Sequence, residues 1–237
     1  MTIPDKPAPP KNRKELFERL SAIVQHGKYE MPTEKYSGTG APGLYLEDLL
    51  GLSTGNRDVP DTLGWELKFY SPDTNLITLF HKEPEPEGIM RYMVSKWGWK
   101  DAKGRLSFRH TIEGKSDMFK VETDNDRIII RPLKNPNGQV PHWTFDSIMG
   151  SAGAKLRRLV LVHGVRKGQK ITYDRTDCFE DLELNFFVWE VAAGTIKIDF
   201  DCREAKPDSK GLRNHGTKFR ISPKDVCRIY SKKERIG

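Results

Sequence analysis

Alternation of apolar and charged residues is clearest in one stretch near the end of the first quarter of the chain. The stretch from Asp58 to Tyr70 reads D-V-P-D-T-L-G-W-E-L-K-F-Y, and Glu66 and Lys68 lie between apolar residues near its end. A period of two sends successive side chains to opposite faces of a strand. The pattern therefore predicts a strand over 64–70, with Glu66 and Lys68 on one face and the apolar side chains turned to a core.

The rest of the chain predicts a mixed α/β domain in which a central mixed sheet is flanked by helices. Helices are expected over 12–26, 44–50, 88–97, 145–156, 182–193 and 223–230. Further strands are expected over 75–81, 105–112, 118–123, 127–131, 159–163 and 196–200. We expect strand 64–70 to pair with 75–81 as a hairpin. Residues 203–215 are expected to form a polar, basic loop.

Composition indicates one soluble globular domain with two lobes. The chain has 237 residues, of which 36% are hydrophobic and 31% charged, enough to bury a core. The Pro-rich residues 1–10 are expected to be loose, and 11–237 to form a single domain. We place one lobe at roughly 11–85 plus later segments, and the second lobe mostly at 86–237.

The charge balance favours a polyanionic partner. Lys and Arg number 40 against 33 Asp and Glu, a formal charge of +7, and nucleic acid is the polyanion most often bound by such chains. A basic protein without such a partner remains the alternative. The sequence contains no bilayer-spanning apolar run and no signal-peptide core. Its three cysteines, Cys178, Cys202 and Cys227, lack metal-ligand spacing, which indicates free thiols in the cytoplasm.

The predicted strand also carries candidate chemistry. Asp61 precedes it by a short Thr-Leu-Gly link that can curve back, so Asp61, Glu66 and Lys68 can converge. Two carboxylates can hold a hard divalent cation, and a lysine can steady an attacking water or a phosphate. The alternative is a solvated strand face with an ion pair between residues two apart, since short matches of this kind are common by accident.

Basic residues with interleaved aromatics form two candidate nucleic-acid contacts. Long cations contact phosphates, and Arg and His can also donate to guanine in the major groove. Each cluster has a solvated face as its alternative. The loop over 203–216 is the stronger candidate, because its Pro, Ser and Gly leave it flexible. The first cluster comprises Arg91, Tyr92, Lys96, Trp97, Trp99 and Lys100, and the second Lys206, Lys210, Arg213, His215, Lys218 and Arg220.

Five sequence blocks in order resemble the MvaI/BcnI-type restriction endonucleases, which are similar in fold to the mismatch-repair nickase MutH. The blocks are G-L-Y-L-E-D-L-L, D-T-L-G-W-E-L-K, N-L-I-T-L-F-H-K-E-P, W-T-F-D-S and H-G-T-K-F-R-I. The resemblance runs from about residue 12 onwards. It implies a restriction-endonuclease-like, MutH-like core of the PD-(D/E)xK superfamily, with two lobes around a DNA cleft.

The resemblance also implies roles for individual residues. Asp61 and Glu66 match metal ligands, Lys68 the catalytic lysine, and Glu47 an upstream acidic residue that helps orient the metal site. Mg²⁺, with Mn²⁺ as a substitute, would be held by Asp61, Glu66 and the carbonyl of Leu67. The residues expected to contact DNA are His81, Lys210, Arg213, His215, Lys218 and Arg220. Arg213 departs from the family, because the members compared have His at that position.

The activity implied is Mg²⁺-dependent cleavage of double-stranded DNA at a five-base-pair C·G site with a degenerate centre. The family acts as a monomer that nicks one strand and then the other. A cognate DNA methyltransferase is expected in the host, without a direct complex. Two alternatives remain at this point: a MutH-like repair nickase, and a DNA-binding module of the same fold that does not cut.

Overall fold

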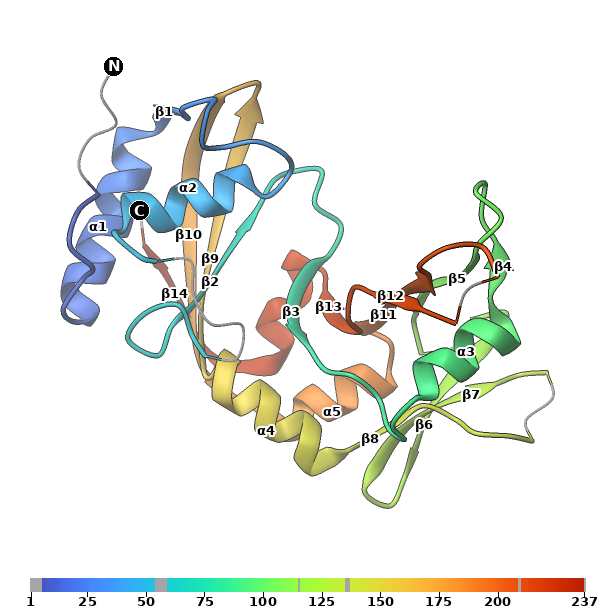
Figure 1. Ribbon diagram of the computed structural model, residues 1–237. Helices are drawn as coiled ribbons and strands as arrows, with labels where there is room; N and C mark the ends of the chain where they lie inside the picture. Colours follow the sequence, from blue (N-terminus) through green and yellow to red (C-terminus); the bar gives the residue numbers. More distant parts are fainter. Residues whose placement is uncertain (1–5, 54–58, 115, 135–136, 209, 237) are drawn as a thin grey trace. The chain divides into compact units, whose positions relative to one another are not determined.

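A computed structural model describes residues 6–53, 59–114, 116–134, 137–208 and 210–236, and the chain forms a mixed α/β fold (Figure 1). Two compact units divide it. Unit 1 comprises the described residues of Met1–Ile77, Gly153–Glu183 and Tyr230–Gly237. Unit 2 comprises those of Thr78–Ala152 and Leu184–Ile229. Each unit therefore contains segments that are far apart in sequence.

Unit 1 is built on a mixed five-stranded sheet with the order β1-β10-β9-β2, in which β14 also pairs with β10. Only β2 and β9 run parallel; the other pairs are antiparallel. The strand expected over 159–163 lies in β9, between β10 and β2. Its near-continuous apolar run fits this central position, because both faces of a central strand can be covered. The strands are β1 Lys28–Glu30, β2 Glu66–Tyr70, β9 Arg158–Lys167, β10 Lys170–Leu182 and β14 Tyr230–Ile236.

Two helices of unit 1 contribute to the same apolar core as one sheet face. Helix α1, Arg13–His26, begins where the side chain of Asn12 accepts a hydrogen bond from the Glu15 N–H, and ends at Gly27. Helix α2, Ala41–Leu49, begins three residues before the predicted start at 44. Both place leucines in a core with Leu67 and Val160, where each buried aliphatic side chain contributes about 1.5–3 kcal/mol.

The described part of the N-terminal segment lies against these helices. Lys6 Nζ is 2.7 Å from an oxygen of Asp48, and Arg19 donates to the carbonyl of Ala8 at 2.5 Å. Residues 1–5, the other part of the expected loose segment, lie outside the described residues.

Unit 2 contains two sheets and is rich in buried aromatic rings. In the larger sheet the order is β3-β13-β11-β5-β4, with β12 on β11; in the smaller it is β6-β7-β8. Phe80 stacks on Phe219 at 5.0 Å between ring centroids, which joins β3 to β13. The strands are β3 Ile77–His81, β4 Trp99–Lys100, β5 Leu106–Ile112, β6 Phe119–Asp124, β7 Arg127–Pro132, β8 His142–Thr144, β11 Ile196–Glu204, β12 Leu212–Asn214 and β13 Lys218–Ile221. The first residue of β3, Ile77, belongs to unit 1.

The helices of unit 2 follow the predicted positions. Helices α3, Ile89–Trp97, and α5, Leu184–Ala192, lie within the ranges expected from the sequence. Helix α4, Phe145–Leu156, has the predicted bounds, and its last four residues belong to unit 1. No helix in the described residues combines the length and the apolar character that crossing a membrane requires.

The predicted hairpin between 64–70 and 75–81 is wrong. Strand β2 pairs in parallel with β9, and β3 pairs with β13 in the other sheet. The two strands are each present, but local proximity does not decide their partners. A parallel pair needs a long crossover connection, and here residues 78–152 of unit 2 lie between β2 and β9 in the sequence.

Two further expectations fail near the C-terminus. The predicted loop over 203–215 is partly a hairpin, because β11 extends to Glu204 and pairs with β12, with Arg203 opposite Arg213. The predicted helix over 223–230 is a 3₁₀ helix, η1, Pro223–Ile229. The chain then continues as β14, which was not predicted because it is almost entirely polar and charged.

Candidate active site and DNA-binding residues

A tight turn folds Asp61 back onto the start of β2. Thr62 and Trp65 exchange backbone hydrogen bonds of 3.1 and 2.6 Å, and Leu63 and Gly64 between them have φ of 48° and 78°. The left-handed region at Gly64 costs little because glycine has no Cβ. The turn brings Asp61 Oδ2 to 2.7 Å from the N–H of Leu67, which donates to it. Asp61 therefore lies beside β2, as the Thr-Leu-Gly link predicted.

Glu66 is a buried carboxylate between two lysines. Its side chain is 1% exposed, and Oε1 lies 2.5 Å from Lys68 Nζ and 3.4 Å from Lys155 Nζ. The ion pair between residues two apart is therefore present, but on a buried site rather than on a solvated strand face. Within the described part of the chain, the buried Oε2 of Glu66 has no hydrogen-bond partner. A buried oxygen of this kind is suited to a cation or a donor from a ligand.

Glu47 extends the carboxylate cluster from α2. Burial, together with the negative charges of Asp61 and Glu66 and against the opposing charge of Lys68, raises the pKa of Glu47 to about 7. The structure thus places Asp61, Glu66 and Lys68 together at the start of β2, and their charges act on Glu47.

Lys155 was not predicted from the sequence. It lies in the last turn of α4, where a basic residue is common, so the sequence contains no signal that separates it from an ordinary surface lysine. The end of α4 is fixed by Tyr230, whose hydroxyl donates to the carbonyl of Leu156 at 2.7 Å. Burial raises the pKa of Tyr230, and the negative charge of Glu66 raises it further. Lys155 and Tyr230 therefore belong to the surroundings of Glu66.

The donor set of this cluster suits a hard cation. Among the described residues, no three side chains of His, Cys, Asp or Glu form a complete metal-binding group. Mg²⁺, however, commonly takes one or two carboxylates and fills its other positions with water and substrate phosphate. The oxygens of Asp61 and Glu66, with the unpartnered Oε2 of Glu66, fit such a cation.

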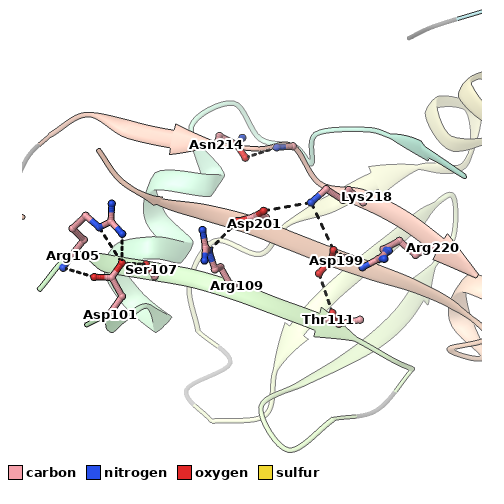
Figure 2. Close-up of polar contacts among 11 residues, drawn as sticks. Asp101, Arg105, Ser107, Arg109, Thr111, Asp199, Asp201, Asn214, Lys218 and Arg220 are labelled. Atoms are coloured by element: carbon pink, nitrogen blue, oxygen red, sulfur yellow. Dashed lines mark hydrogen bonds and ion pairs between the residues drawn. The ribbon is translucent and has the colours of Figure 1, made fainter. Parts of the chain in front are cut away.

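The predicted DNA-contacting residues lie in unit 2, on β3 and from the β11–β12 hairpin to β13. Lys218 lies 3.5 Å from Asp201, and Arg220 lies 3.2 Å from Asp199, on the sheet face drawn in Figure 2. These two cations therefore share the polar sheet face with carboxylates. The other predicted residues are exposed: His81, Lys210, Arg213 and His215.

His81 is placed directly against the C-terminal segment. An added Cβ at Gly216 would lie 2.9 Å from Cδ2 of His81, and Gly216 has φ of +86°. Glu83 holds the segment around Gly216 in place, because its carboxylate accepts hydrogen bonds from the Asn214 amide at 2.9 Å and from the Thr217 N–H at 2.8 Å. The structure therefore joins two elements that the sequence separates by more than a hundred residues.

Four guanidinium groups gather on the polar face of β5, β11 and β12. Partial burial and the neighbouring Arg105, Arg109 and Arg213 lower the pKa of Arg203. Asp101 and Asp201 each pair with one of these arginines, at 2.7 Å to Arg105 and 3.0 Å to Arg109 (Figure 2). Four cations beside two carboxylates leave an excess of positive charge. The apolar periodicity of the sequence did not predict this group of arginines.

Comparisons with known proteins agree with this geometry. The MvaI/BcnI restriction endonuclease family matches residues 18–230. A solved structure described as "Restriction endonuclease MvaI-cognate DNA substrate complex" is similar at 25% identity and a TM-score of 0.77, covering 94% of this chain and 98% of that one. "Restriction endonuclease MvaI in the absence of DNA" is similar at 25% identity and a TM-score of 0.57, covering 94% and 96%.

No curated protein sequence matches the chain. The family match nevertheless spans both units and includes each predicted catalytic residue. The fold is restriction-endonuclease-like, as predicted. The chain belongs to the MvaI/BcnI restriction endonuclease family, and is a type II site-specific endonuclease of DNA.

Proposed function

We propose that this enzyme cuts double-stranded DNA with Mg²⁺ bound at Asp61, Glu66 and the carbonyl of Leu67, and that Mn²⁺ can substitute. One observation carries the proposal: Glu66 is buried with Oε1 held by two lysines and Oε2 without a hydrogen-bond partner in the described residues. When bound, the metal neutralises the attacked phosphate and lowers the pKa of a water molecule.

The protein groups around the metal position have separate tasks. Burial raises the pKa of Glu66, and the positive charges of Lys68 and Lys155 oppose this shift and favour the ionised carboxylate. Lys68 is more exposed than Glu66, so its ammonium can steady the attacking water and offset negative charge on the phosphate. Glu47, with a pKa of about 7, orients the site and becomes fully ionised beside a bound cation.

For the substrate, we propose a five-base-pair C·G site with a degenerate centre. Base reading is assigned to the segment 203–220 together with His81, and the proposal is supported by the closeness of Gly216 to His81, because a Cβ added at Gly216 would lie 2.9 Å from Cδ2 of His81. Arg213 is exposed, and its guanidinium can span O6 and N7 of guanine. We further propose a cytoplasmic monomer that nicks the two strands in succession and is accompanied in its host by a methyltransferase. The three free cysteines agree with a reducing compartment.

The central test combines plasmid cleavage with one isosteric substitution. Supercoiled plasmid, incubated with the enzyme and Mg²⁺, is expected to yield nicked and then linear DNA, and sequencing of the ends gives the site. Glu66→Gln keeps the shape of the side chain and removes its charge. It should retain site binding while cleavage falls by orders of magnitude.

Three results would contradict parts of the proposal. Full cleavage by Glu66→Gln in Mg²⁺ would exclude the metal role of Glu66. Cleavage confined to hemimethylated or mismatched DNA would point to a repair nickase instead. Site-specific binding without cleavage by the unmodified chain would identify a silent DNA-binding module.

A further inference from the structure

The sheet face that carries Glu66 and Lys68 continues across unit 1. Directly paired residues point to the same side of a sheet, and Lys68 pairs with Leu161, which in turn pairs with Asp177. Asp177 pairs with Arg235 on β14. Strands β2, β9, β10 and β14 are neighbours in the sheet (Figure 1). By their pairing, Lys68, the buried Leu161, Asp177 and Arg235 form one row on the same face.

Three cations on this face share one buried carboxylate. Asp177 is 4% exposed, and it lies 3.0 Å from Arg235, 3.5 Å from Arg175 and 3.6 Å from Lys233. The three cationic side chains are 39–58% exposed. We call these four residues the Asp177 cluster. One carboxylate cannot neutralise three cations, so the cluster keeps an excess of positive charge, which the nearby Asp174 offsets only in part.

Neighbouring side chains hold the part of the cluster nearest β2. The Tyr70 hydroxyl accepts a hydrogen bond from Arg175, and the guanidinium lies 5.7 Å from the centre of the Tyr70 ring. Between them in the sheet, Nδ1 of His163 is 2.5 Å from the carboxylate of Asp174, at an irregularity of the β9–β10 register. Such irregularities re-aim side chains near functional sites. Tyr70 follows Lys68 by two residues, so this group adjoins the catalytic lysine on the same face.

We propose that the Asp177 cluster is a second contact with the DNA backbone, remote from the cleaved bond and outside the base-reading segment. The inference rests on the proposed function, because it places the scissile phosphate at Glu66 and Lys68. Neighbouring strands are about 4.8 Å apart, so β10 and β14 lie about 10 and 14 Å from β2. With a rise of about 3.4 Å per base pair along the duplex, this span corresponds to about three or four base pairs.

The chemistry of the cluster selects a phosphate backbone over an apolar or cationic ligand. Three exposed cations fixed by a shared carboxylate lose little side-chain entropy when an anion binds. Repulsion among them is relieved by phosphate oxygens, and each contact releases counterions from DNA. A five-base-pair site with cleavage inside it would place the contacted phosphates at or beyond its edge. The cluster therefore contributes affinity for flanking DNA without contributing to sequence choice.

Binding measurements in the Glu66→Gln background test the cluster without cleavage of the DNA. Lys233→Gln and Arg235→Gln should each weaken binding several-fold on all sequences alike, and should reduce the salt slope by about one. Lys232→Gln is the matched control. Lys232 is exposed, pairs with Asp181 and points to the opposite face of the same strand, so its loss should leave the slope unchanged.

Neutral methylphosphonates placed singly along the duplex locate the contact. Neutralising the contacted phosphate should weaken binding by the parent protein, but should add nothing to the loss caused by Arg235→Gln. Additive losses at every position would overturn the proposal. So would an unchanged salt slope in both cluster variants, or an equal fall in Lys232→Gln.

Two measurements separate this inference from a purely structural cluster and from the proposed function. Asp177→Asn removes the carboxylate and keeps all three cations, so the unfolding midpoint should fall while the salt slope stays at least as steep. A shallower slope in Asp177→Asn would overturn the proposal. Failure of the unmodified enzyme to cut any plasmid would contradict the proposed function, whereas cleavage with unaffected cluster variants would contradict only this inference.

Discussion

Asp48→Asn should destabilise unit 1 in a manner that depends on pH. Asp48 is the α2 residue next to Glu47, and its carboxylate lies 2.7 Å from Lys6 and 2.5 Å from Lys35, and accepts from the Tyr36 hydroxyl. Burial alone would raise the pKa of Asp48, but the hydrogen bonds from Lys35, Lys6 and Tyr36 outweigh it and lower the pKa from 3.8 to about 2.

The pKa sets the size of the effect. A fall from 3.8 to about 2 corresponds to about 2–3 kcal/mol in favour of the ionised carboxylate, at about 1.4 kcal/mol per pKa unit. The side chains of Lys6 and Lys35 are 40% and 47% exposed, so solvent screens part of this attraction. We therefore expect Asp48→Asn to lower the free energy of unfolding at neutral pH by about 1–2 kcal/mol.

The sign of the pH dependence follows from linkage. Because the folded pKa lies below the unfolded value, the stabilisation is complete above about pH 4 and is lost as the pH falls toward 2. Urea denaturation of the two proteins from pH 7 to pH 3 should show the difference shrinking with acid. A difference that stays constant over this range, or no loss of stability at neutral pH, would refute the electrostatic origin.

Three other substitutions test the site. Arg213→Ala should relax preference at one base position and leave non-specific binding nearly unchanged, whereas a uniform loss with a salt slope lower by about one would show that Arg213 contacts a phosphate. Lys155→Met should slow cleavage more than it weakens DNA binding, because Glu66 loses one of its two cationic partners; equal effects on both would count against a role at Glu66. Gly216→Ala should displace His81 and change site preference, while Gly104→Ala, which has a similar φ and nothing within 4 Å, should affect stability only.

Residues close together in sequence were predictable, and their geometry was confirmed. The alternation around Glu66 predicted β2, and the Thr-Leu-Gly link predicted the turn that returns Asp61 to it. Both depend on local rules: side-chain period in a strand, and the freedom of glycine at positive φ. The helix expected over 12–26 was confirmed as α1, whose ends are likewise set locally, by the side chain of Asn12 and by Gly27.

Partners that are remote in sequence were not predictable. The hairpin between β2 and β3 is favoured by proximity, yet β2 finds a buried parallel partner in β9 after the whole of residues 78–152. Strand β14 has no apolar alternation, because its side chains Lys233 and Arg235 are held by Asp177 rather than by a core. Apolar periodicity marks strands with an apolar face, and it is therefore absent from a strand whose side chains are held by ion pairs.

The chemistry of Glu66 shows why a short motif is insufficient by itself. In an exposed strand, Glu66 and Lys68 would form a screened ion pair that contributes at most about 1 kcal/mol. Here the end of α4 supplies Lys155, and Tyr230, the first residue of β14, binds the carbonyl of Leu156 at that helix end. Residues separated from Glu66 by 89 and 164 positions therefore determine the burial and the cationic surroundings of its carboxylate. The D…ExK motif identifies a candidate, but it is this distant packing that gives the strand pair the surroundings of the metal site we propose. Substitutions at Lys155 and Tyr230 should therefore alter catalysis although neither residue belongs to the motif.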